Sequence, residues 1–198
     1  MDGAVRCLTD FTDARLRQLT DLLIDCVDGG ASVSFMSPLS AFKAADYWRG
    51  VAEGVRRGER TLLVAEDAGG IVASVQLVLG QPENQPHRAD ISKMLVLRRV
   101  RRRGLGEALL RTAESMALAL GKSLLVLDTA SSDAERLYAR LGWRRCGVIP
   151  GYALLPQGGL CDTTIFYRQL TPGARPPMSL SAPTSPGSGA ALVRPITE

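Results

Sequence analysis

The feature that most constrains this chain is a run of three arginines and two glycines at residues 101–106. It stands between an apolar run at 94–97 and an amphipathic helical pattern that covers Glu107 to Leu120. A glycine loop that joins a strand to a helix presents free backbone N–H groups to an anion, and the helix dipole favours negative charge there. Because arginine side chains add positive charge beside those groups, the segment predicts a site for a phosphate-bearing ligand.

The residues predicted to form this site are Arg101, Arg102, Arg103, Gly104, Leu105 and Gly106. The segment is not a Walker A loop, because it lacks the Gly-Lys-Ser/Thr ending. It is not a dinucleotide fingerprint either, because Leu109 stands where a third glycine is needed. The motif alone leaves open a plain arginine-rich surface loop with a glycine at the helix N-cap.

Hydrophobic periodicity predicts the elements around this loop. We expect helices at 13–27, 37–57, 107–120 and 133–141, with Ser37 and Pro38 as N-cap and first helical residue of the second helix. We expect strands at 4–8, 61–65, 71–79, 90–97, 123–128, 144–149 and 162–169, with Pro150 to Tyr152 in the last loop. The strand–helix–strand unit from Asp90 to Asp128 predicts one parallel pair with a right-handed crossover. The fold class is α/β (α+β-like), a mixed sheet with helices on both faces.

The positive charge of the chain is local. Its 198 residues carry a formal charge of +4, and six arginines lie between Arg98 and Arg111. A general nucleic-acid binder spreads such charge over a face or an arm. We therefore expect no nucleic-acid partner, although a nucleic-acid patch at 98–103 remains an alternative hypothesis.

The ends and the cysteines suggest a cytoplasmic protein of one domain. No signal peptide precedes residue 15, and no apolar run is long enough to predict a membrane contact. The four cysteines are scattered, which favours reduced core residues over disulfides or a metal site. Residues 1–170 form the predicted domain. Residues 171–198 hold six of the eleven prolines and are predicted to be disordered.

Two motifs in order resemble the GNAT superfamily of N-acetyltransferases. Arg101, Gly104 and Gly106 match its acyl-CoA motif, Arg/Gln-x-x-Gly-x-Gly/Ala. Residues 134–143 are similar to its closing motif, Ala-x-x-Leu-Tyr-x-x-Leu-Gly-Phe. The resemblance implies a mostly antiparallel sheet with a splayed parallel pair and acetyl-CoA as co-substrate, without a metal. It also implies that free backbone groups of Leu95, Val96 and Leu97 pair with the pantetheine arm.

Segments 29–33, 88–97, 127–129 and 150–152 are similar to the tabtoxin-resistance acetyltransferases of that superfamily. This similarity implies acetyl transfer to the amine of a small, amino-acid-like antimetabolite, in other words resistance or detoxification. An aminoglycoside, a polyamine or a protein N-terminus stays open as acceptor, as does an acyl-CoA sensor without turnover. Whether the protein is a monomer or a homodimer is also open.

Amine attack on a thioester needs a base and an acid. The resemblance makes Asp90, at the start of the cofactor strand, the leading base, directly or through water; the alternative is a structural pair with Arg88. Asp128, at the end of a buried strand, is implied to face the active site and to hold a cationic amine, or else is a turn carboxylate. Tyr138 is implied to be the acid that protonates the leaving thiolate, and its alternative is packing.

Three further residues complete the predicted site. Ser131 stands where the family often has an asparagine on the pantetheine arm, and its hydroxyl is expected to substitute. Ser32 and Tyr152 are predicted to line the acceptor side. His87, the only histidine, has no cysteine or histidine partner nearby, so no metal site is predicted.

Overall fold

The computed structural model describes residues 4–171. The predicted disordered tail lies outside the described residues, apart from its first position. Among residues 4–171, no helix is long and apolar enough to cross a membrane.

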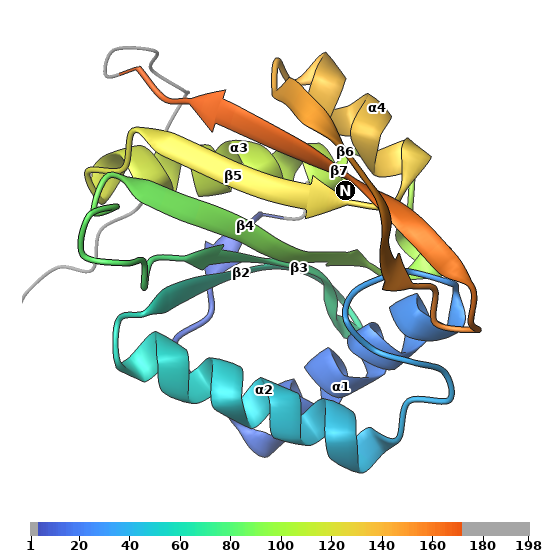
Figure 1. Cartoon of the computed structure of the whole chain (residues 1–198). Helices are drawn as coiled ribbons and strands as arrows, with labels where there is room; N and C mark the ends of the chain where they lie inside the picture. Colours follow the sequence, from blue (N-terminus) through green and yellow to red (C-terminus); the bar gives the residue numbers. More distant parts are fainter. Residues whose placement is uncertain (1–3, 172–198) are drawn as a thin grey trace, which may run out of the picture.

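A single seven-stranded sheet runs through the molecule in the order β1-β2-β3-β4-β5-β7-β6 (Figure 1). Only β4 and β5 pair in parallel, and every other neighbouring pair is antiparallel. The predicted mixed sheet with one parallel pair is thereby confirmed. The strands are β1 Arg6–Cys7, β2 Arg60–Asp67, β3 Gly70–Val78, β4 Arg88–Val96, β5 Leu124–Thr129, β6 Arg144–Leu154 and β7 Leu160–Gln169.

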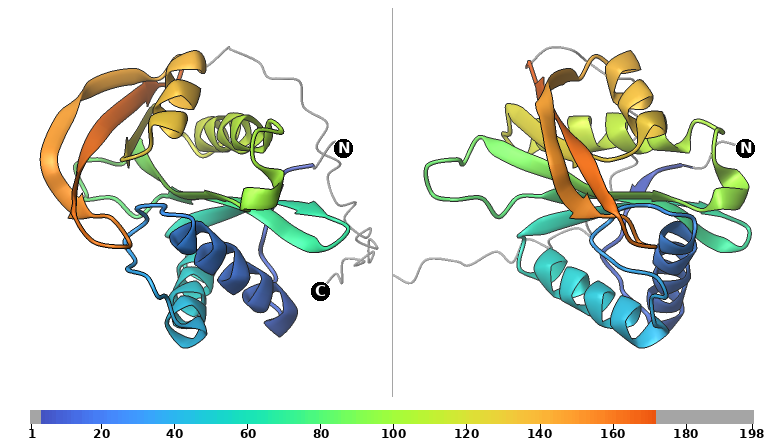
Figure 2. Two further views of the ribbon diagram at one scale, coloured as in Figure 1. Left: turned by 90° about the vertical axis from the view of Figure 1, so that its right-hand side faces the viewer. Right: turned by 45° about the vertical axis from the view of Figure 1, so that its right-hand side comes forward.

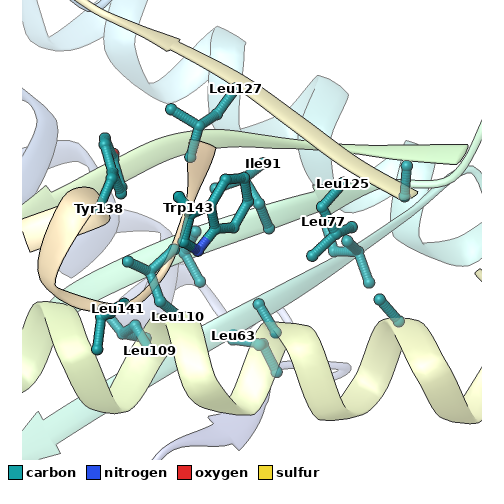
Figure 3. Close-up of a cluster of buried hydrophobic side chains, with 14 of the residues drawn as sticks. Leu63, Leu77, Ile91, Leu109, Leu110, Leu125, Leu127, Tyr138, Leu141 and Trp143 are labelled. Carbon is teal, nitrogen blue, oxygen red and sulfur yellow. The ribbon is translucent and has the colours of Figure 1, made fainter. Parts of the chain in front are cut away.

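Helices cover both faces of the sheet, as the sequence predicts (Figures 1 and 2). Helices α1 (Asp13–Asp28) and α2 (Ala41–Arg56) pack on one face, whereas α3 (Leu105–Ala119) and α4 (Ser132–Arg140) lie over the other. Side chains of a strand alternate between faces, so Leu62 of β2 packs with α1 and α2, and Leu63 packs with α3. Figure 3 shows the second of these cores, where Leu109 and Leu110 of α3 meet the sheet.

The predicted start of the second helix is wrong by three residues. Helix α2 begins at Ala41, and Ser40 is its N-cap because its Oγ accepts from the Lys43 N–H at 3.2 Å. The Ser37 hydroxyl instead donates to the Asp28 carboxylate at 3.4 Å. As a result, Phe42 falls in the first turn of the helix and is 77% exposed.

Three smaller expectations also fail. Residues 150–152 are part of β6 rather than of a loop, because the β6–β7 hairpin continues past an irregular register between Ile149 and Ala153. Helix α3 ends at Ala119, so Leu120 becomes an exposed C-cap. All four cysteines are free, as expected, but Cys146 is exposed rather than in the core.

Candidate active site

Strands β4 and β5 separate after three paired positions. Pairing runs from Arg88 opposite Leu124 to Asp90 opposite Val126 and then stops, although β4 continues to Val96 and β5 to Thr129. The register between β3 and β4 also shifts in this stretch, and Lys93 has a φ of +49°. Such a bulge bends the strand and redirects its side chains. The separation confirms the predicted splayed pair and leaves one edge of β4 unpaired.

The unpaired edge exposes fewer backbone groups than the sequence led us to expect. The Leu97 N–H donates to the Val72 carbonyl at 2.9 Å, so it is not free. Alternate residues of an antiparallel strand turn their backbone groups to opposite sides. The groups of Val96 therefore face the gap, where its carbonyl accepts from Arg101 Nε at 3.1 Å. The Val96 N–H remains as a donor to a ligand in the gap.

The arginine–glycine loop leads from β4 into α3. Gly104 is the N-cap with a φ of +83°, a conformation that glycine adopts without strain. The N–H groups of residues 105–107 have no acceptor within the helix, because the first helical bond runs from Ala108 to Gly104. A Cβ on Gly106 would lie 3.0 Å from Leu137 Cδ2, so glycine lets α4 approach the start of α3.

The three loop arginines have different surroundings. Arg101 lines the cavity beside the loop, as does Arg102, whose guanidinium lies 3.5 Å from the Asp133 carboxylate. Arg103 was also predicted to bind the cofactor, but it does not line the cavity. Glu107 also lines the cavity in the first turn of α3, and its carboxylate is paired with Arg111 at 2.9 Å and Arg140 at 3.6 Å.

A cavity of about 920 Å³ fills the gap between the separated strands, large enough for a cofactor-sized ligand. One end is formed by the loop and the first turn of α3, with Arg136 and Arg140 of α4 nearby. The other end is formed by residues 29–34 after α1 and by Lys93 and Asp128. The cavity thus connects an anion-binding helix N-terminus with a pocket that carries both charges.

Tyr138 lies between these ends, on α4. The residue is 4% exposed. Its ring packs against Trp143 (Figure 3) and Phe166, with centroid distances of 5.9 and 5.6 Å. Burial raises the pKa of Tyr138 well above its usual range, and the negative charge of Asp128 raises it further. Because Tyr138 also lines the cavity, a protonated hydroxyl is held at the ligand site.

Asp128 lies beyond the last residue of β5 that pairs with β4, and its side chain lines the cavity. One carboxylate oxygen accepts from the Thr163 hydroxyl at 3.1 Å, which leaves the other oxygen available to a ligand. The predicted orientation of Asp128 toward the site agrees with this placement.

Asp90 is placed differently. Arg88 donates to both oxygens of its carboxylate, from Nε at 3.0 Å and from Nη2 at 2.9 Å, and Asp90 does not line the cavity. The alternative interpretation of Asp90 as a structural partner of Arg88 therefore holds. The reason is local: side chains two apart on a strand share a face.

Of the remaining predicted site residues, some line the cavity and others do not. Ser131 lines the cavity, but its hydroxyl caps α4 by accepting from the Ala134 N–H at 3.3 Å. Ser32 lines the cavity in the segment 29–34, and its Oγ lies 3.8 Å from Cys161 Sγ. Tyr152 is 55% exposed on β6 and does not line the cavity, and Leu97 does not line it either.

The sequence analysis missed Lys93, one of three lysines in the chain. It lines the cavity, and burial lowers the pKa of its ammonium group, while Asp128 opposes that shift. Its side chain enters the cavity from the bulge, and strict alternation along β4 gives no sign of that. The only signal was a lysine inside the predicted strand, directly before the apolar run that begins at Met94.

The cavity suits a long, phosphate-bearing acyl donor. The helix N-terminus, Arg101 and Arg102 fit phosphate groups, the β4 edge fits amide groups, and Tyr138 lines the same cavity. Within the described part of the chain, no three histidine, cysteine or acidic side chains gather as a metal site. The fold and the site are those of a protein with a ligand cavity between two separated strands.

The comparisons give the family. The family model described as Acetyltransferase (GNAT) family matches residues 19–143, so the chain belongs to that family and is an acetyl-CoA-dependent N-acetyltransferase. Three similar structures are the N-acetyltransferase from Staphylococcus aureus Mu50, the ribosomal-protein-alanine N-acetyltransferase from Brucella melitensis and the phosphinothricin acetyltransferase (Pat) from Sinorhizobium meliloti in complex with AcCoA.

Their identities to this chain are 16%, 21% and 21%, and their TM-scores are 0.70, 0.68 and 0.71. The matches cover 84%, 84% and 92% of this chain and 98%, 99% and 97% of the other chains. At these identities they show a shared fold.

Proposed function

We propose that this protein moves the acetyl group of acetyl-CoA directly to the amine of a small, amino-acid-like molecule, as in the detoxification of an antimetabolite. The observation that carries the proposal is the single cavity that joins the arginine–glycine loop to Asp128 and Tyr138. The similarity to a phosphinothricin acetyltransferase structure supports the acceptor class.

Acetyl-CoA would lie along the unpaired edge of β4. The pyrophosphate would bind the free N–H groups of residues 105–107 and the guanidinium of Arg101. The pantetheine amides would pair with the edge near Val96, as an added strand does. Ser131 would contact the same arm, with its hydroxyl already used as a helix cap.

The chemistry would use two side chains of this cavity. Asp128 would hold the cationic amine by charge and accept its proton, directly or through a water. The amine nitrogen would then attack the thioester carbonyl carbon, and the Val96 N–H would donate to the oxyanion. As the carbon–sulfur bond breaks, the Tyr138 hydroxyl would donate its proton to the thiolate, and the resulting phenolate would take up the second proton that the amine nitrogen releases as the amide forms. Asp90 has no part in this sequence, because Arg88 holds both of its oxygens.

The test is a panel of amines with purified protein and acetyl-CoA, read out as free thiol. The panel contains phosphinothricin, an aminoglycoside, spermidine and a peptide with a free N-terminus. Amine-dependent thiol release with the amino acid supports the proposal. If another class of amine gives faster thiol release, that class is the acceptor, and the protein is still an acetyltransferase.

A sensor without turnover, the alternative that the sequence left open, is the outcome that would contradict acetyl transfer. It predicts thermal stabilisation by acetyl-CoA without thiol release from any amine. A lack of stabilisation at millimolar acetyl-CoA would contradict both functions.

A further inference from the structure

We propose that Lys93, together with Ser34, binds an anionic group of the acceptor, so that the enzyme selects amines that also carry a carboxylate. The proposal rests on the proposed acetyl transfer and adds a specificity-determining residue to it.

Lys93 is held in place by the fold. It lies on the bulge of β4 with a φ of +49°, a conformation that costs free energy in a residue with a Cβ and that persists where the surroundings fix it. Its side chain reaches across the cavity to the loop after α1, where Nζ donates to Ser34 Oγ at 3.1 Å. The strand and the loop therefore meet at one ammonium group.

That ammonium group has unused hydrogen-bonding capacity. A lysine has three N–H donors, and among residues 4–171 its one hydrogen-bond partner is the neutral Ser34 hydroxyl, with no carboxylate within ion-pair distance. Removing a charge from water without an opposite charge is unfavourable. Of the two charges that act on the Lys93 ammonium group, the negative charge of Asp128 has the larger effect and the positive charge of Arg60 the smaller one. An incoming carboxylate would satisfy both the donors and the charge.

The pocket carries one charge of each sign. Lys93 and Asp128 are close enough to affect each other electrostatically, but they form no ion pair in the described residues. An acceptor with an amine and a carboxylate a few bonds apart would match both, with its amine at Asp128 and its carboxylate at Lys93. A polyamine or an aminoglycoside would instead place a positive charge against the ammonium group.

The experiment compares each acid with its own amide. L-Methionine, L-phenylalanine, L-lysine and phosphinothricin are assayed against their α-carboxamides, with thiol release as the readout. For at least one pair we expect kcat/KM to be about tenfold or more higher for the acid. Lys93→Met should remove that preference by lowering kcat/KM for the acid about 10- to 100-fold, as expected for a charged hydrogen bond. The carboxamide rate and the KM for acetyl-CoA should stay unchanged.

Two variants separate specificity from folding and from proton transfer. Lys93→Arg should keep part of the acid preference. Lys122→Met removes an exposed lysine that bonds to the Pro86 carbonyl outside the cavity, and it should behave as wild type. If Lys93→Met slows acids and carboxamides equally and shifts the pH profile of kcat, Lys93 acts as a base and the proposal is wrong.

The remaining outcomes are also distinct. Turnover of carboxamides or simple amines at the same rate as acids overturns the proposal and leaves the acetyltransferase intact. No turnover of any amine, with acetyl-CoA still bound, removes the proposed function and the inference that rests on it.

Discussion

Arg88 donates two hydrogen bonds to the Asp90 carboxylate on β4, at 3.0 and 2.9 Å. Because both carboxylate oxygens are bound, Asp90 has a structural role. Asp128, on the neighbouring strand, keeps a carboxylate oxygen for the cavity. The two acids therefore predict opposite results on substitution.

Asp90→Asn should leave kcat within about twofold of wild type. The ion pair is about one-third exposed, so its loss should lower the free energy of unfolding by about 0.5 kcal/mol. Asp128→Asn should lower kcat by about 100-fold, because the amine loses its base. Steady-state kinetics with the best acceptor of the panel measure both, and urea unfolding measures the stability. A large loss in Asp90→Asn with Asp128→Asn active would reverse the two roles.

Tyr138→Phe should lower kcat by about 100-fold with little change in the KM for acetyl-CoA. The ring contacts with Trp143 and Phe166 remain in phenylalanine, so the melting temperature should stay close to that of wild type. Stopped-flow detection of thiol release at saturating substrates tests this directly. Full activity in a folded variant would assign Tyr138 to packing alone.

The raised pKa of Tyr138 also predicts a loss of stability at alkaline pH. An unfolded tyrosine ionises near pH 10, whereas the folded one keeps its proton to higher pH. Above about pH 10 the unfolded state has therefore released a proton that the native state retains, and stability falls as the pH rises, by up to about 1.4 kcal/mol per pH unit.

Because Tyr138→Phe lacks this proton, its free energy of unfolding should fall less than that of wild type between pH 8 and pH 11. Urea titrations at both values measure the difference, and Tyr152→Phe, on an exposed tyrosine, is the matched control. Parallel losses in wild type and Tyr138→Phe would mean that the hydroxyl is not withdrawn from water.

The fold was predictable where local patterns decide it. The helical stripe of α3 and the apolar run of β5 predicted the parallel unit, and the glycines predicted the loop between β4 and α3. The start of α2 was missed because Ser37 and Ser40 are both plausible N-caps, and only tertiary contacts choose between them.

The site was predictable in part for a similar reason. The resemblance to the GNAT superfamily pointed to Tyr138 and Asp128, and both residues line the cavity. The sequence did not predict Lys93 as a site residue, because a bulge interrupts the two-residue alternation on which strand assignments depend. The sequence leaves both interpretations of Asp90 open, and the folded strand shows the geometry of its pair with Arg88.

The different placement of two neighbouring arginines gives the last prediction. Arg101 lines the cavity and bonds to the Val96 carbonyl, whereas Arg103 lies outside the cavity. Arg101→Gln should raise the KM for acetyl-CoA about tenfold or more, because a charged hydrogen bond to phosphate is lost together with support for the β4 edge. Arg103→Gln makes the same charge change in the same loop and should raise the KM less than threefold. The KM of both variants is compared in 50 and 300 mM salt, since salt screens the long-range electrostatic attraction to which both arginines contribute. If KM rises equally in the two variants, and the rise disappears in high salt, the loop attracts acetyl-CoA only by its overall positive charge and does not bind a particular phosphate group.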